Sequence, residues 1–292
     1  MIDSYYKEIK KQFSGLIEEE KKSLVFNENK IHKFIEDNPT CILASVMNGM
    51  VENYNIYGSS IFSKIPIGGW ERRVPDFILI TYNSVEITFN LIEIEAPNRK
   101  IFTGANDFTS EFNHSYTQLE DWKRLFPSNS TEMVDKMVVS CFSDLGVFDG
   151  TRAINAKYIL VYGSSDEYNG IQLKKHRLNQ KFSNSEFYFI SYDRLIRNFV
   201  TESAIFTLKY NSLSGGFKVI GWMPFLKYPL GRRREFGRIE NKAELISDSH
   251  FLSKLEKEYL IDKIEELDKL SIQELEKLDM GIDLSNFDEE YS

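Results

Sequence analysis

Two apolar, β-branched runs with a short turn between them constrain the fold of this chain more than any other feature. The first run spans residues 74–80, the second spans residues 85–97, and residues 82–84 form the turn. Such runs are typical of adjacent β-strands. We therefore expect two neighbouring strands, the second of which ends in acidic residues.

The acids of this strand pair are predicted to gather in one place. Side chains alternate along a strand, so Glu93 and Glu95 share a face, roughly 7 Å apart. Asp76 lies beside them if the strands are antiparallel. Each pair of carboxylates about 4 Å apart costs ~1 kcal/mol in water and ~4 kcal/mol near a protein surface. A bound cation would relieve this repulsion, although two solvated acids at a strand end would show the same spacing.

The donor atoms decide which cation fits. Carboxylate oxygens with room for water suit Mg²⁺ or Mn²⁺ better than Zn²⁺, which prefers nitrogen and sulfur ligands. Cys41 and Cys141 stand alone in apolar runs without a CxxC pattern, so we expect buried packing residues rather than a zinc site or a disulfide.

Composition indicates a globular protein with an uneven charge distribution. The 292 residues are 42% hydrophobic, enough for one sizeable core plus an extension. Without a long apolar stretch or a signal-peptide core, we expect a cytoplasmic protein with no membrane segment. Residues 240–292 hold 16 acids and 6 bases, whereas residues 1–239 hold 28 acids and 30 bases. The net charge of −8 therefore belongs to the tail and does not exclude a nucleic-acid partner.

Strands alternate with helices along the chain, which indicates an α/β sheet. Besides the central pair, we predict strands at residues 41–45, 137–142, 156–163 and 186–191, and a hairpin within residues 203–222. Helices are predicted within residues 1–36, over 27–37, from 107 to 126 ending before Pro127, near 173–178, from Asp193, and from 247 to 279. The leucine stripe between residues 252 and 270 needs a partner, either its own domain or another subunit.

Two of these helices carry polar residues of interest. Glu28 and His32 are one turn apart on the helix of residues 27–37, a pair that most often lies on a solvated surface. Gln118 and Trp122 are one turn apart on the helix of residues 107–126. We expect Trp122 to pack in the core, whereas Gln118 could face the strand that carries Glu93.

Six short motifs occur in an order that identifies a family resemblance. They are IHKFIEDNP at 31–39, PDF at 75–77, LIEIEAP at 91–97, Gln118 with Trp122, ILVYG at 159–163 and SYDRL at 191–195. Over about residues 25–200, this order resembles the Shedu family of prokaryotic anti-phage proteins, whose shared domain belongs to the PD-(D/E)xK nuclease superfamily.

The resemblance implies a set of site residues. Asp76 and Glu93 correspond to the metal-holding acids, Gln118 to the motif glutamine, and Glu28 to an acid from the preceding helix. The usual lysine of the signature is replaced by Glu95, so either Glu95 or the nearby Lys100 would orient or deprotonate the attacking water. The candidate contacts to the nucleic-acid backbone are Arg72, Arg73, Arg99, Lys100, Arg232, Arg233 and Arg234. The last three could equally pair with the acidic tail.

Together these features predict an α/β fold with a restriction-endonuclease-like mixed sheet, flanked by helices and followed by a helical C-terminal extension. The expected divisions are an N-terminal helical segment (1–24), a nuclease-like domain (25–200) and the extension (201–292). The expected function is Mg²⁺- or Mn²⁺-dependent DNA cleavage or nicking in phage defence, by a homo-oligomer. The alternatives are an inactive nuclease-like module that senses nucleic acid or a protein partner, and a purely structural oligomer.

Overall fold

The computed structural model describes residues 2–25, 27–47, 55–67, 73–134, 150–199, 206–211, 216–222, 240–248 and 253–268. Its helices are α1 (Ile2–Lys22), α2 (Glu28–Asp37), α3 (Thr40–Met47), α4 (Ser110–Val134), α5 (Gln172–Lys181), α6 (Tyr192–Arg197), α9 (Lys242–Asp248) and α10 (Lys254–Asp268), with a 3₁₀ turn η2 (Ser165–Glu167). Its strands are β1 (Asn55–Ser63), β2 (Phe77–Tyr82), β3 (Glu86–Ile94), β4 (Ala153–Val161), β5 (Phe187–Ile190), β6 (Phe206–Asn211) and β7 (Gly216–Trp222).

The described strands form one mixed sheet in the order β5-β4-β3-β2-β1-β6-β7. Strands β3, β4 and β5 are parallel, β2 is antiparallel to both of its neighbours, and β6 runs parallel to β1 before pairing with β7 as a hairpin. The predicted α/β class, the adjacent central strands and the C-terminal hairpin are therefore confirmed. The central pair is antiparallel, the condition under which Asp76 was expected to lie beside Glu93.

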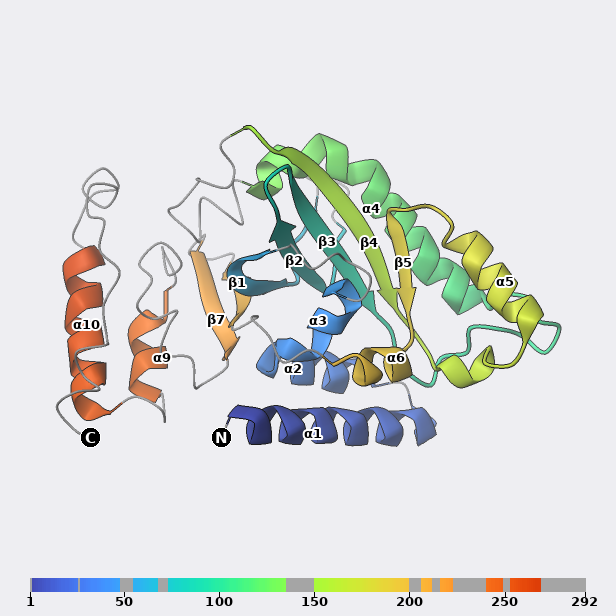
Figure 1. Ribbon diagram of the computed structural model, residues 1–292, viewed down its shortest axis with the longest axis horizontal. Coiled ribbons are helices and arrows are strands. Elements are labelled where there is room, and N and C mark those ends of the chain that lie inside the picture. Colours follow the sequence, from blue (N-terminus) through green and yellow to red (C-terminus); the bar gives the residue numbers. More distant parts are fainter. Residues whose placement is uncertain are drawn as a thin grey trace.

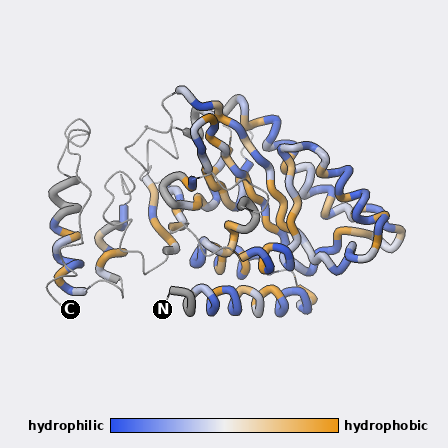
Figure 2. The backbone as a smooth tube through the Cα atoms, viewed as in Figure 1, coloured by the Kyte–Doolittle hydropathy of each residue, from blue (hydrophilic) through white to orange (hydrophobic). Residues whose placement is uncertain are grey.

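Helices cover both faces of this sheet (Figure 1). On one face, α4 and α5 pack against side chains that include Ile78, Phe89 and Leu91, and Trp122 of α4 is buried there as predicted. On the other face, α1, α2, α3 and α6 pack against side chains that include Phe77 and Ile92. Figure 2 shows the resulting pattern, with apolar residues concentrated in the central strands and in stripes along the helices. Because β2 and β3 are buried on both faces, their apolar runs are nearly continuous.

The expected strand at residues 41–45 is wrong, because these residues belong to helix α3. Cys41, Ile42 and Leu43 are all buried, so this short segment is apolar on every side. A short apolar run without periodicity does not distinguish a buried helix from a buried strand. The expectation that Cys41 is a buried packing residue is confirmed, whereas Cys141 and the strand expected at residues 137–142 lie outside the described residues.

Two helix boundaries also differ from expectation. Helix α4 passes through Pro127 and continues to Val134. Phe126, immediately before this proline, is buried and packs against Phe89 at a ring-centroid distance of 5.4 Å, so tertiary packing outweighs the local helix-breaking effect.

The helix expected from 247 to 279 is not continuous in the described residues. Helix α9 ends at Asp248 and α10 starts at Lys254. Ser253 and Glu256 form a reciprocal capping box, in which each backbone N–H donates to the other side chain, at 2.7 and 3.3 Å, and this fixes the new start. Leu260 is buried, so part of the leucine stripe packs within the chain itself. Among the described helices, none combines the length and apolarity needed to span a membrane.

Candidate active site

Three of the predicted acids meet where β3 ends and β2 begins. Glu93 lies on the same face of β3 as Leu91, and helix α4 covers this face. The register Phe77↔Ile92 places the preceding residue, Asp76, opposite Glu93. Asp76 Oδ2 accepts a hydrogen bond from the Ile94 N–H at 3.0 Å, which fixes its carboxylate against the end of β3. Glu95 follows directly, so these acids project from adjoining backbone segments.

Arg99 joins a fourth acid to this group. Its Nη1 lies 3.0 Å from Glu95 Oε2, and its Nη2 lies 3.9 Å from Oε2 of Glu28, in the first turn of α2. The other oxygen of Glu95 accepts a 2.6 Å hydrogen bond from Ser115 Oγ on α4. Glu95 is therefore held in place by a cation and a hydroxyl group, one from each side. We call Glu28, Asp76, Glu93 and Glu95 the acid cluster.

The acid cluster has less positive charge than it needs to keep every carboxyl ionised. Burial raises the pKa of Asp76 to about 7, and repulsion from Glu28 and Glu95 acts in the same direction. Burial, followed by the charges of Asp76, Glu95 and Glu28, raises the pKa of Glu93 well above its ordinary value. Burial and then the charge of Glu95 also raise the pKa of Glu28. A bound cation would offset this repulsion and lower the pKa values of these carboxyl groups.

Lys64, which the sequence did not single out, is the cation whose charge acts on most of the acid cluster. It follows β1, has a left-handed backbone (φ 53°), and its N–H donates to the Asp76 carbonyl oxygen at 3.0 Å. Its charge opposes the upward pKa shifts that burial causes at Asp76, Glu93 and Glu28. The side chain is exposed and makes no ion pair within the described part of the chain.

Lys100 lies elsewhere. Its carbonyl oxygen accepts a 2.7 Å hydrogen bond from Thr109 Oγ1, and its charge acts on Glu167, whose pKa burial raises. The charge of Lys64 acts on Asp76, Glu93 and Glu28, whereas the substitution of Lys100 for the missing lysine stays a prediction. No local pattern in the sequence marks Lys64, because the approach of β1 to β2 is a tertiary contact.

Gln118 lies on α4, the helix that covers this face of β3. It lies one turn after Ser115, the residue that binds Glu95, and its Oε1 is buried without a hydrogen-bond partner among the described residues. A buried amide oxygen without a partner indicates a site for water or an ion.

His32 is the main site residue that sequence reasoning missed. The expectation of a solvated helix surface is wrong for this residue, which is 5% exposed. Its ring stacks on Phe77 at a centroid distance of 4.7 Å, and its Nε2 lies 3.6 Å from Asp76 Oδ1. Burial, and then the charge of Lys64, lower the pKa of His32 to about 4, so the imidazole is neutral at pH 7. The position of His32 between the buried Ile31 and Ile35 was a signal in the sequence that could have placed it.

The predicted nucleic-acid contacts are only partly described. Arg73 donates to Asp121 Oδ2 of α4 from Nε at 3.1 Å and from Nη2 at 2.9 Å. Arg99 binds the acid cluster, and Lys100 is exposed. The remaining members of the set, Arg72, Arg232, Arg233 and Arg234, lie outside the described residues.

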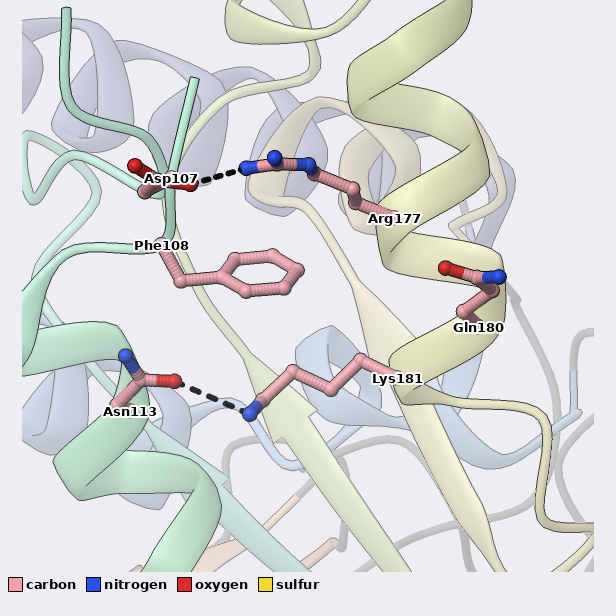
Figure 3. Close-up of a pocket in the computed structure, with 6 residues that line it drawn as sticks. All are labelled: Asp107, Phe108, Asn113, Arg177, Gln180 and Lys181. Atoms are coloured by element: carbon pink, nitrogen blue, oxygen red, sulfur yellow. Dashed lines mark hydrogen bonds and ion pairs between the residues drawn. The ribbon is translucent and has the colours of Figure 1, made fainter. Parts of the chain in front are cut away.

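A separate cavity of about 450 Å³ lies between the start of α4 and helix α5 (Figure 3). It is lined by Asp107, Phe108, Asn113, Arg177, Gln180 and Lys181. Figure 3 shows that its cations are already engaged, Arg177 with Asp107 and Lys181 with Asn113, the latter at 3.0 Å. None of the acid cluster lines this cavity, so it is not the predicted site.

The acid cluster fits a divalent cation in charge and donor type. Its carboxylates supply oxygen ligands of the kind that Mg²⁺ and Mn²⁺ take. Asp76 and Glu95 are buried, Glu93 and Glu28 are partly buried, and the compensating positive charge is too small. No three His, Cys, Asp or Glu side chains of the described residues already surround a common point. Binding would therefore need side-chain rotation within the cluster.

Gly163 shapes the loop that carries Arg99. Its φ is +58°, and a Cβ at this position would lie 3.0 Å from the Arg99 carbonyl oxygen. A left-handed conformation costs an L-residue about 1–2 kcal/mol. We expect Gly163→Ala to lower the free energy of unfolding by about that amount, measured by urea denaturation. Gly104→Ala is the control, because a Cβ there meets nothing within 4 Å; equal effects of the two changes would contradict this role.

A mixed sheet between two helical layers, with acids gathered at the end of a central strand, defines an α/β protein consistent with a nuclease-like fold. The family model described as Shedu protein SduA, C-terminal, matches residues 26–196, more than half of the chain. The chain therefore belongs to the Shedu family, as the resemblance predicted. Comparison with curated proteins gave no match. Membership in this family suggests a role in anti-phage defence.

Proposed function

We propose that this chain is a divalent-metal-dependent DNA endonuclease or nickase of the PD-(D/E)xK superfamily that acts in anti-phage defence. The observation that carries the proposal is the acid cluster, in which four carboxyl groups from α2, β3 and adjoining loops gather where α4 also contributes Ser115 and Gln118. Buried acids at one end of a central strand are costly for stability. We therefore infer that the chain retains these acids because they form a functional site.

Each residue of the site is proposed to have a separate role in phosphodiester hydrolysis. Asp76 and Glu93 would hold Mg²⁺ or Mn²⁺, and Gln118 would present its amide to the attacking water or to the ion. A bound divalent cation stabilises charge on the phosphate and lowers the pKa of water toward neutrality. Glu95, whose two oxygens are bound by Ser115 and Arg99, would orient the site through these contacts rather than act as a free base.

Lys64 is proposed to contact the scissile phosphate, because it is an exposed cation next to the acids and no acid pairs with it among the described residues. Removing one preorganised charge-stabilising group typically costs about 10²-fold in kcat. We expect Lys64→Met to lower the kcat of DNA cleavage by about that factor, measured on supercoiled plasmid. Lys7→Met, an exposed change on α1, is the matched control. An unchanged kcat for Lys64→Met would remove this residue from the proposed mechanism.

Binding of the DNA backbone is proposed to involve Arg73, Arg99 and Lys100, with Arg72 and residues 232–234 as further contacts. Such contacts are sequence-tolerant and weaken with salt. A homo-oligomer, expected from the leucine stripe, would extend this surface, and sedimentation of the full chain tests for it.

The second candidate function is a nuclease-like module that binds nucleic acid without cutting it. The observation in its favour is the ion pair between Arg99 and Glu95, which occupies the position where the signature normally has a lysine. Incubation of the purified chain with supercoiled, linear and single-stranded DNA, in Mg²⁺, Mn²⁺ or chelator, separates the two functions. Metal-dependent cutting supports the endonuclease; a gel shift with all three substrates intact supports the binding module.

A further inference from the structure

His32 presents a buried nitrogen atom for which the described residues provide no hydrogen bond. Nε2 of this residue has no partner among them, although the side chain is almost completely enclosed. It faces Asp76 Oδ1 at a distance of 3.6 Å. A buried polar atom without a partner is rare in folded proteins and indicates an additional group such as an ion.

The other ring nitrogen of His32 faces a carboxylate. Nδ1 lies 3.6 Å from Glu36 Oε1, one turn further along α2. When a cation binds beside Asp76, the ring proton is favoured on Nδ1, where Glu36 attracts it, and the lone pair of Nε2 faces the cation. Histidines that bind metals almost always direct their second ring nitrogen at a carboxylate, a carbonyl or water in this way.

The surroundings of His32 fix its orientation. Glu36 accepts a 2.6 Å hydrogen bond from Ser63 Oγ and lies 3.6 Å from Lys209 Nζ, so contacts from β1 and β6 hold its carboxylate. The imidazole lies nearly parallel to the ring of Phe77, at an interplanar angle of 19°. The direction of the Nε2 lone pair is therefore set by the fold.

We propose that His32 Nε2 is a ligand of the divalent cation, together with Asp76 and Glu93, and that Glu36 positions the imidazole. This inference rests on the proposed metal-dependent function and specifies its metal site. Ligand atoms about 2.1 Å from an octahedral ion lie roughly 3 Å apart at neighbouring positions. The observed 3.6 Å between Nε2 and Oδ1 therefore closes with a small side-chain movement.

A nitrogen ligand changes which metal the site prefers. Mg²⁺ takes oxygen ligands and keeps much of its water, whereas imidazole suits transition metals. The acid cluster with His32 should therefore bind Mn²⁺ more tightly than Mg²⁺, whereas an all-oxygen site would discriminate less. The probes are these two ions added to the chelator-treated full chain.

Calorimetric titration and pulsed electron paramagnetic resonance of the Mn²⁺-loaded protein test the inference without relying on activity. We expect a ¹⁴N coupling to Mn²⁺ in the wild type. We also expect His32→Gln to abolish it and to weaken Mn²⁺ binding by about 10–100-fold, with a smaller effect on Mg²⁺. Glu36→Gln should weaken Mn²⁺ binding less, and His114→Gln, on the exposed face of α4, should preserve the coupling.

The outcomes distinguish this inference from the proposed function. Mn²⁺ bound to the wild type without nitrogen coupling, or with coupling that persists in His32→Gln, overturns the role of His32 even if the protein cuts DNA. Nitrogen-coordinated Mn²⁺ in a protein that leaves DNA intact supports the ligand and overturns the hydrolysis. Absence of Mn²⁺ binding overturns both. The absence of nitrogen coupling in the wild type overturns the role of His32 without any variant, and the spectrum of His32→Gln assigns a coupling that is present to this residue.

Discussion

Replacing Asp76 with asparagine is expected to reduce metal-dependent DNA cleavage by about 10³-fold, the equivalent of about 4 kcal/mol of transition-state stabilisation. Asparagine keeps the size of the side chain and an oxygen that can accept the Ile94 N–H bond. It removes the charge that would hold the cation opposite Glu93. The measurement is the initial rate of nicking of supercoiled plasmid in Mn²⁺ and in Mg²⁺.

The control for Asp76→Asn is an acid on the surface of the same layer. Glu120 is exposed on α4, and Glu120→Gln removes one negative charge without touching the acid cluster. It should cleave DNA at the wild-type rate. If Asp76→Asn and the wild type nick DNA equally fast, and protect cells equally in a phage challenge, the acid cluster is not the catalytic centre.

The strand pair that carries the site could be predicted from sequence because both of its determinants are local. The β-branched runs fix strands β2 and β3, and the alternation of side chains places Glu93 on the face of Leu91. With the antiparallel pairing that the structure shows, Asp76 lies opposite Glu93 at the end of β3. Gln118 lies on α4 one turn before the buried Trp122, and this place on the helix follows from the helical spacing of the sequence.

Contacts that depend on how distant segments pack could not be predicted in the same way. Lys64 reaches the acids because β1 pairs with β2, and Lys209 reaches Glu36 because β6 joins the sheet beside β1. His32 was misplaced because a polar residue among Lys and Glu resembles a solvated surface, although its neighbours Ile31 and Ile35 are core residues. Helix α3 was missed because its apolar residues carry no period that distinguishes a helix from a strand.

The metal-free protein is expected to lose stability as the pH rises from 5 to 7, and Asp76 is a principal cause. The ordinary pKa of its carboxyl group is 3.8, and burial raises this pKa to about 7 in the folded state. Between these values the folded chain holds a proton that the unfolded chain has released. The protonated Asp76 therefore contributes fully to the stability of the fold below its ordinary pKa. This contribution is lost as the pH rises through the pKa that Asp76 has in the folded state. Over two pH units this amounts to about 2–3 kcal/mol.

Urea denaturation of the wild type and of Asp76→Asn in chelator, at pH 5, 6, 7 and 8, measures this loss. Between pH 5 and pH 7, the free energy of unfolding of the wild type should fall by about 2–3 kcal/mol relative to that of the variant. Above pH 8 this difference should change little. If the free energy of unfolding changed equally with pH in the wild type and in the variant, the pKa of Asp76 would not be raised in the folded state. Adding Mn²⁺ at pH 8 should restore the stability of the wild type more than that of the variant, because the cation binds the ionised carboxylates that destabilise the empty site. The destabilisation of the metal-free acid cluster and its affinity for a cation therefore have the same electrostatic origin.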